Sequence, residues 1–85
     1  MDQRLIQDCN IGENLKRLRK KAGFTQLEVS AKLQVMGLPV SREIYAQIES
    51  GKHHIKIRVL LGLKRIYKAT YEELLEDETG ERNIV

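Results

Sequence analysis

Apolar residues recur three and four positions apart along most of the chain, which is the spacing of one face of an α-helix. From Ile11 to Ala22, the apolar residues Ile11, Leu15 and Leu18 fall on one stripe, and basic residues occupy the opposite side. Residues that interrupt helices separate segments of helical length; they are Gly23, Gly37, Pro39 and Gly51. No segment shows the sustained alternation of a strand between hairpin turns. The pattern therefore predicts an all-α chain.

A capping-box pattern marks the start of the second predicted helix. Thr25 precedes Glu28 by three residues, so each side chain can bond the backbone N–H of the other. The apolar residues of this helix are Leu27, Val29, Ala31 and Leu33. The helix is expected to end near Gly37. Because proline disrupts a helix interior, Pro39 makes residues 36–40 a connection.

Three further helices are predicted after this connection. Ser41 is a candidate N-cap for a helix over residues 42–50, and its inner face is expected to hold Ile44, Tyr45 and Ile48. Residues 57–68 predict a fourth helix, and Thr70 with Glu73 predicts a short fifth one. The fourth helix is expected to pack at the centre because it is rich in apolar residues, namely Ile57, Leu60, Leu61, Leu63, Ile66 and Tyr67.

A length of 85 residues fits one small domain and is too short for two. A core of this size is marginal, so self-association is expected to help stabilise it. No run of about 18 apolar residues is present, so no membrane segment is expected. The start of the chain lacks the apolar stretch of a signal peptide, and Cys9 is the only cysteine. These features predict a cytoplasmic protein in a reducing compartment.

The formal net charge is +3, but the charged residues are distributed unevenly along the chain. Residues 11–24 contain five Lys or Arg and one Glu, and residues 56–68 contain five Lys or Arg and no acid. Residues 69–85 contain six Asp or Glu and one Arg. A basic body attracts polyanions such as nucleic acid, although basic residues that merely solvate helix faces give the same pattern. Three Tyr, one Phe and no Trp are too few for a platform that stacks single-stranded bases.

Two short helices joined by a turn, the second opened by a serine, form the layout of a helix-turn-helix. The segments IGENLKRLRKKAGFTQLEVSAKL, SREIYAQIESGK and LLGLKRIYKATYEELL resemble the lambda-repressor-like (XRE, Cro/repressor-type) DNA-binding domains. This resemblance implies a compact five-helix bundle whose second and third helices form the helix-turn-helix, with an enlarged turn. The domain is expected over residues 11–76, between an N-terminal extension (1–10) and an acidic tail (77–85).

The resemblance implies that the third helix reads base edges in DNA. The residues that match base-reading positions are Arg42, Glu43, Ala46 and Gln47. Arg42 can bind guanine through O6 and N7, and Gln47 can bind adenine through N6 and N7. Glu43 either accepts a hydrogen bond from a cytosine amine or pairs with Arg42. Ala46 is small enough to touch a thymine methyl group.

The resemblance also implies phosphate contacts, for which the candidates are Arg19, Thr25, Gln26, Ser41, Ser50, Lys52 and His53. Gln26 opens the second helix, where backbone N–H groups favour an anion. The alternative is that Gln26 is an ordinary exposed residue of the first turn. Arg19 and Glu49 match a partly buried pair that sets the angle of the third helix.

The sequence departs from the family pattern at several positions. The connection QVMGLPV before Ser41 is about five residues longer than the usual short turn. Ile44 stands where a small polar residue is usual and is expected to pack against this turn. Tyr45 replaces a buried aliphatic residue and is expected in the core; the alternative is that its hydroxyl emerges toward a phosphate. Ile55 replaces a common proline. Lys64 replaces a common buried alanine, so the fourth helix is expected either to be rotated or to have a less tightly packed inner face.

Cys9, His53 and His54 raise the question of a metal site. Structural zinc takes four ligands at close spacing, whereas Cys9 is distant in sequence from the histidines. No metal or other cofactor is therefore expected, and the histidines are interpreted as solvated loop residues. The chain also lacks a glycine-rich phosphate loop and a Cys/His pair at nucleophile spacing, so no enzyme is expected.

These features predict a sequence-specific regulator that binds double-stranded DNA, most simply a bacterial or phage-encoded repressor at an operator. One small domain contacts few base pairs, so a homodimer on two half-sites is expected. Its dimer surface is expected around the fifth helix and the acidic tail, because phosphate repels the acids of residues 72–81. The alternative is a protein-interaction module, such as the antitoxin of a toxin–antitoxin pair, which binds a partner protein through residues 77–85.

Overall fold

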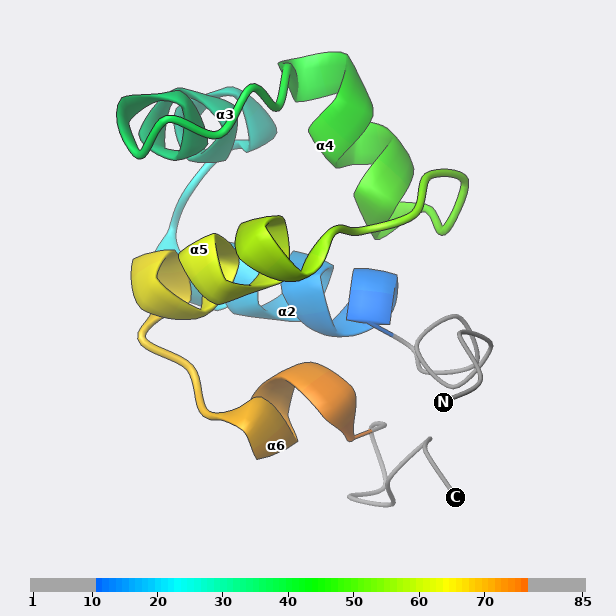
Figure 1. The fold of residues 1–85 in the computed structure, drawn as a ribbon. Coiled ribbons are helices and arrows are strands. Elements are labelled where there is room, and N and C mark those ends of the chain that lie inside the picture. The colour runs from blue at the N-terminus through cyan, green and yellow to red at the C-terminus, as the bar shows by residue number, and fades with distance from the viewer. Residues whose placement is uncertain (1–10, 77–85) are drawn as a thin grey trace.

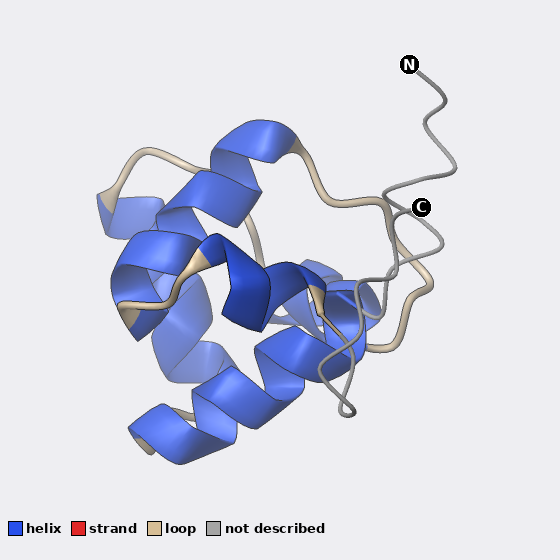
Figure 2. Ribbon diagram, turned by 90° about the horizontal axis from the view of Figure 1, so that it is seen from below, coloured by secondary structure: helices blue, strands red, loops and turns tan. Residues whose placement is uncertain are grey.

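The computed structural model describes residues 11–76, which contain five helices and no strand (Figures 1 and 2). The helices are α2 (Ile11–Ala22), α3 (Gln26–Val35), α4 (Arg42–Glu49), α5 (Ile57–Tyr67) and α6 (Tyr71–Leu75). The predicted all-α class and helix order are thus confirmed. The expected extension (1–10), which contains Cys9, and the expected tail (77–85) lie outside the described residues. No helix of the described part is long and apolar enough to cross a membrane.

Side-chain caps start three of the helices at the predicted residues. The Thr25 hydroxyl accepts the Glu28 N–H at 3.1 Å, and the Glu28 carboxylate accepts the Thr25 N–H at 2.8 Å. Thr70 and Glu73 form the same capping box on α6. The Ser41 hydroxyl accepts a backbone N–H from the first turn of α4 at 3.1 Å. These starts were predictable because a cap joins residues only three apart in sequence.

The core lies between α2, α3, α4 and α5, and α6 packs against α2. The apolar side chains with no exposed surface are Leu15, Val29, Leu33, Tyr45, Leu63 and Leu74. A Cβ atom added to Gly12 would lie 2.4 Å from the carbonyl oxygen of Glu49, so only a glycine allows α2 and α4 to approach this closely. The buried Asn14 amide of α2 donates to the carbonyl oxygen of Leu74 at 2.6 Å, which ties α6 to α2.

Some apolar residues of α5 and α3 face solvent, although α5 was expected to pack at the centre. Ile57 is 55% exposed and Leu61 is 42% exposed, whereas Val59 is buried. Ile57 and Leu61 lie one turn apart on the outer side of α5, which packs against α2 and α3 only on its inner side. On α3, Leu27 is 63% exposed and Ala31 is also exposed.

Helix ends also differ slightly from the expected ones. α3 ends at Val35, and α4 ends one residue before Ser50, which is its C-cap. α5 ends at Tyr67 because Lys68 adopts the left-handed conformation (φ 52°), which stops a helix. Lys64 is half-buried, and its ammonium group lies 4.7 Å from the centre of the Tyr71 ring. The aliphatic part of a lysine can cover apolar surface while the charge reaches a ring face.

Candidate nucleic-acid interface

α4 has eight residues, with a buried side and an exposed side. The buried residues are Tyr45, Ile48 and Glu49. The exposed residues are Arg42, Glu43 and Gln47, and Ala46 is half-buried. At 3.6 residues per turn, the four predicted base-reading residues fall together on the side opposite Ile48. The structure therefore brings these four residues to one outward side of α4.

Glu49, the last residue of α4, joins three helices. Its carboxylate accepts two hydrogen bonds from Arg19 of α2, from Nε at 2.7 Å and from Nη2 at 3.2 Å. The side chains of Arg19 and Glu49 are only 12% and 4% exposed. The same carboxylate accepts the side-chain amide of Gln26 on α3 at 3.1 Å. Arg19 also donates to the carbonyl oxygen of Phe24 at 3.0 Å. This network holds the end of α4 against α2 and α3.

The charged state of the pair follows from these contacts. Burial alone would raise the pKa of Glu49, but hydrogen bonds from Arg19, Tyr45 and Gln26 outweigh burial and lower that pKa. The hydrogen bond to Glu49 raises the pKa of Arg19 against the opposing effect of burial. Both groups are therefore charged at neutral pH, so the network contains a partly buried ion pair with matched hydrogen bonds.

A pair of buried tyrosines fixes the middle of α4. Tyr45 has no exposed surface, and its hydroxyl is hydrogen-bonded to that of Tyr67 on α5. Burial raises the pKa of Tyr67 to about 12, and burial also raises the pKa of Tyr45. Both hydroxyls are neutral at physiological pH and can share one hydrogen bond. Tyr45 thus belongs to the core, as expected, and also contributes a polar contact that the sequence pattern did not indicate.

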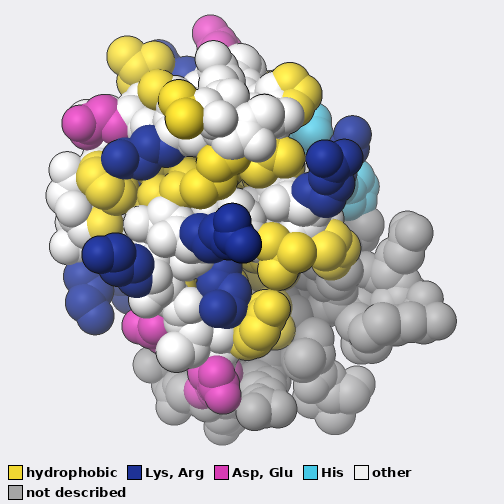
Figure 3. Space-filling model, turned by 60° about the vertical axis from the view of Figure 1, so that its left-hand side comes forward, with side chains coloured by type: hydrophobic (Ala, Val, Ile, Leu, Met, Phe, Trp, Pro, Cys, Tyr) yellow, Lys and Arg dark blue, Asp and Glu magenta, His cyan; other side chains and the backbone are white. Residues whose placement is uncertain are grey.

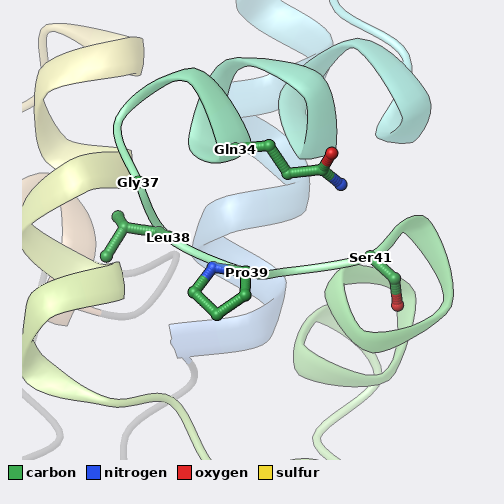
Figure 4. A pocket seen from close by; sticks show the side chains of 5 residues that line it. All are labelled: Gln34, Gly37, Leu38, Pro39 and Ser41. Atoms are coloured by element: carbon green, nitrogen blue, oxygen red, sulfur yellow. The ribbon is translucent and has the colours of Figure 1, made fainter.

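The enlarged turn between α3 and α4 has a defined shape. The Ser30 hydroxyl and the Gln34 amide both donate to the carbonyl oxygen of Val40, at 3.0 and 3.2 Å. An open hollow of about 470 Å³ lies beside the turn (Figure 4). It is lined by Gln34, Gly37, Leu38, Pro39 and Ser41. The two hydrogen bonds to Val40 join the end of the turn to α3 and so fix the position at which α4 begins. Ile44 is half-buried against the core cluster.

Comparison with known proteins decides the family. The sequence model for the family described as "Helix-turn-helix domain" matches residues 12–79. The chain belongs to the helix-turn-helix domain family. The family indicates a DNA-binding regulator and agrees with the resemblance to lambda-repressor-like domains. Searches of curated proteins and of solved structures found no significant match.

Most hydroxyl and amide groups expected at phosphates have contacts within this helix-turn-helix domain. The hydroxyls of Thr25 and Ser41 cap α3 and α4. The Ser50 hydroxyl donates to the carbonyl oxygen of Gln47 at 3.1 Å. The contact of Gln26 with Glu49 joins positions 23 residues apart, and no local pattern predicted it. The hydroxyls of Thr25, Ser41 and Ser50 therefore stabilise helix ends, and the Gln26 amide joins α3 to α4.

Cationic and imidazole side chains lie in the connection between α4 and α5 of the helix-turn-helix domain. Lys52, His53 and His54 are all exposed, and a ring nitrogen of His53 is hydrogen-bonded to the carbonyl oxygen of His54 at 2.8 Å. Figure 3 shows Lys and Arg side chains among apolar ones on one face, with histidines beside one basic group. Within residues 11–76, no three His, Cys, Asp or Glu side chains are grouped to hold a metal ion.

Proposed function

We propose that this helix-turn-helix domain binds a specific sequence of double-stranded DNA, with the outer side of α4 in the major groove. The observation that carries this proposal is the division of α4 into a side fixed by Glu49 and Tyr45 and a side on which Arg42 and Gln47 are exposed. An α-helix fits the major groove, where each base pair presents a distinct pattern of donors and acceptors. A rigidly held helix can place side chains against that pattern.

Each outward residue of α4 has a proposed partner. Arg42 binds O6 and N7 of guanine, and Gln47 binds N6 and N7 of adenine. Ala46 lies against a thymine methyl group. Glu43 either accepts a hydrogen bond from a cytosine amine or orients Arg42 through an ion pair. The amide and guanidinium groups carry most of the sequence preference because their contacts are bidentate.

Phosphates on either side of the groove position the helix. The N-terminus of α3 at Thr25 and Gln26 presents backbone N–H groups, and the start of α4 at Ser41 does the same. Lys52 and His53 supply positive charge beyond the end of α4, together with the hydroxyl of Ser50. Arg19 acts mainly through Glu49, because three of its donor contacts are made within the domain.

The simplest biological role is that of a repressor, which occupies an operator and excludes other proteins from it. One domain of this size contacts few base pairs, so specific binding needs two copies on half-sites about one helical turn apart. We therefore propose a homodimer on DNA. Separate protein-binding roles, including that of an antitoxin, are outcomes of the experiment that follows.

Selection of bound duplexes from a random DNA pool tests the proposal. The wild-type chain should enrich a motif with two related half-sites, and Arg42→Ala and Gln47→Ala should each relax one or two positions by about 1–3 kcal/mol. Arg65→Ala is the matched control, because Arg65 is an exposed arginine on α5 and should leave the motif unchanged. Absence of any enriched motif would reject sequence-specific binding and favour a protein-interaction role.

A further inference from the structure

The outward side of α3 is apolar, although solvent faces it. Leu27 is 63% exposed and Val35 is 89% exposed, and Ala31 between them is exposed as well. These three residues are spaced four apart and form one stripe along the helix. The buried residues Val29 and Leu33 lie on the other side of α3. A helix that is apolar on both sides normally has both sides covered.

Charged residues lie along one flank of this stripe, and they are of opposite sign. Glu28 and Lys32 are one helical turn apart, and both are exposed. Glu28 caps the start of α3, and the ammonium group of Lys32 lies 4.8 Å from the centre of the Phe24 ring. The flank therefore carries a negative charge at Glu28 and a positive charge at Lys32, and each side chain is held by a contact within the domain. Such a flank is complementary to its own copy when the two helices run in opposite directions.

We propose that the α3 stripe, formed by Leu27, Ala31 and Val35, is the surface through which two copies of this chain associate. The two α3 helices pack antiparallel about a two-fold axis beside Ala31. Each Ala31 then faces Ala31 of the second copy, and each Leu27 faces Val35 of the second copy. Small residues at the axis allow the helices to approach closely, while the larger apolar residues fill both ends of the contact.

The same two-fold axis brings the charged flanks together. In an antiparallel pair related by this axis, the same flank of each helix meets, as in antiparallel coiled coils. Glu28 of each copy therefore lies beside Lys32 of the other, which gives two attractive pairs. This geometry uses the three residues of the stripe and the two charged residues of its flank, none of which belongs to α4.

A second exposed apolar stripe, on α5, is less suited to a second copy. Ile57 and Leu61 lie on the outer side of α5 beside Arg58 and Arg65, which are both exposed. A two-fold contact there would bring arginines against arginines, and residues 56–68 contain no acid to offset them. Like charges placed opposite each other weaken an interface. The charge pattern therefore selects α3 over α5 as the self-association surface.

The inference rests on the proposed homodimer and names its surface as α3, in place of the surface around the fifth helix and the acidic tail that the sequence led us to expect. It also predicts a weak contact in free solution. Specific interfaces bury about 1,200–2,000 Å² in total, and two short helices cover less than this. Binding of two copies to one duplex raises their effective concentration to the millimolar range, about 10⁻³ M, where a weak contact becomes populated. The α3 contact would thus act chiefly as a source of cooperativity on DNA.

Cysteine cross-linking of the full chain tests the surface directly. In a Cys9→Ser background, Ala31→Cys places a thiol beside the two-fold axis, close enough for a disulfide between copies. Arg65→Cys is the matched control on the exposed side of α5. Mild oxidation should give a covalent dimer for Ala31→Cys and little for Arg65→Cys. Equal cross-linking of both, of Arg65→Cys alone, or of neither would overturn the proposal.

Reversing the charges at Glu28 and Lys32 distinguishes the proposed contact from cross-links that form by random collision. In the Ala31→Cys background, E28K and K32E should each lower the cross-linked fraction by about tenfold, because each leaves like charges facing each other. An equimolar mixture of the two variants should restore it as a mixed dimer. The helical circular dichroism signal checks that each variant folds. Failure of the mixture to recover would overturn the antiparallel geometry.

The outcome is separable from the proposed DNA binding. L27Q and V35Q remove apolar surface without adding charge, so they should reduce cross-linking yet leave the enriched half-site unchanged. If cross-linking behaves as expected and no DNA motif is enriched, the association surface stands and DNA recognition fails. If the motif is enriched and cross-linking fails, DNA recognition stands and the α3 contact is wrong.

Discussion

The inner side of α4 is buried and holds the helix in the fold, whereas the outer side is exposed. The inner residues Tyr45, Ile48 and Glu49 have almost no exposed surface. They hold α4 against α2 and α3, and Tyr45 also binds Tyr67 of α5. The outer side carries Arg42 and Gln47, whose side chains are exposed to solvent. Substitution of the buried inner residues should lower the stability of the fold, whereas substitution of the exposed outer residues should change stability little. Stability and proposed sequence preference therefore lie on opposite sides of the same eight residues.

The largest expected effect comes from the inner side. Glu49→Ala leaves the partly buried Arg19 guanidinium and the Gln26 amide without their shared acceptor, so we expect a loss of about 3 kcal/mol of unfolding free energy. Glu43→Ala is the matched control, because Glu43 is an exposed glutamate of the same helix and should change stability by less than about 0.5 kcal/mol. Urea denaturation measures both. Equal losses would contradict the division of α4.

A second test concerns the close approach of α2 to α4. Gly12→Ala adds a Cβ that would meet the backbone of Ile48 and Glu49 at 2.7 and 2.4 Å. We expect a loss of about 1–3 kcal/mol from overpacking, although alanine is the better helix former. Thermal denaturation followed by circular dichroism measures this loss. An unchanged or higher melting temperature would show that the helices can separate without cost.

The outer side is expected to respond in the opposite way. Arg42→Ala and Gln47→Ala should change unfolding free energy by less than about 0.5 kcal/mol, while each costs about 1–3 kcal/mol of discrimination at the bases it contacts. Competition binding with duplexes altered at single base pairs measures the second quantity. A uniform loss of affinity for all duplexes would identify these residues as phosphate contacts instead.

Acid should weaken the inner side through Glu49. Because the folded-state pKa of Glu49 is lowered, its contribution is present above the unfolded pKa of about 4.3 and is lost as pH falls through the folded pKa. Wild-type stability should therefore fall below about pH 4.3 more steeply than that of Glu49→Gln. Denaturant titrations at a series of pH values measure the difference. Parallel pH profiles would mean that the ion pair contributes nothing.

The smallest expected effect belongs to Lys52, in the connection after α4. Lys52→Ala should weaken binding to all duplexes alike and reduce the slope of log affinity against log salt by about 1. Lys20→Ala, on an exposed position of α2, serves as the control lysine. Binding measured across a range of salt concentrations separates the two. A change in base preference for Lys52→Ala would contradict its role as a phosphate contact.

Local features of this fold were predictable from sequence, and long-range ones were not. The capping boxes at Thr25 and Thr70 depend on neighbours three residues away, so helix starts were placed correctly. The outward position of Leu61 depends on which side of α5 meets α2 and α3, and an apolar sequence cannot specify this. The hydrogen bond from Gln26 to Glu49 likewise arises only after α3 and α4 have packed.

In the candidate site, too, local helical spacing was predictable from the sequence and contacts between helices were not. Helical spacing alone places Glu43 and Gln47 on one side of α4, and their exposure agrees with that expectation. The pairing of Tyr45 with Tyr67 had no sequence signal, because it joins two helices through atoms at the ends of long side chains. Contacts with DNA remain predictions, since they depend on a partner whose sequence the chain does not encode.

Methylation interference on the selected duplex tests most directly whether α4 lies in the major groove. Dimethyl sulfate modifies N7 of guanine in the major groove and N3 of adenine in the minor groove. We expect methylation at specific guanine N7 atoms to block the wild-type chain, and Arg42→Ala to lose sensitivity at one of them. Interference confined to adenine N3 atoms would contradict the account, because it would place the contact in the minor groove.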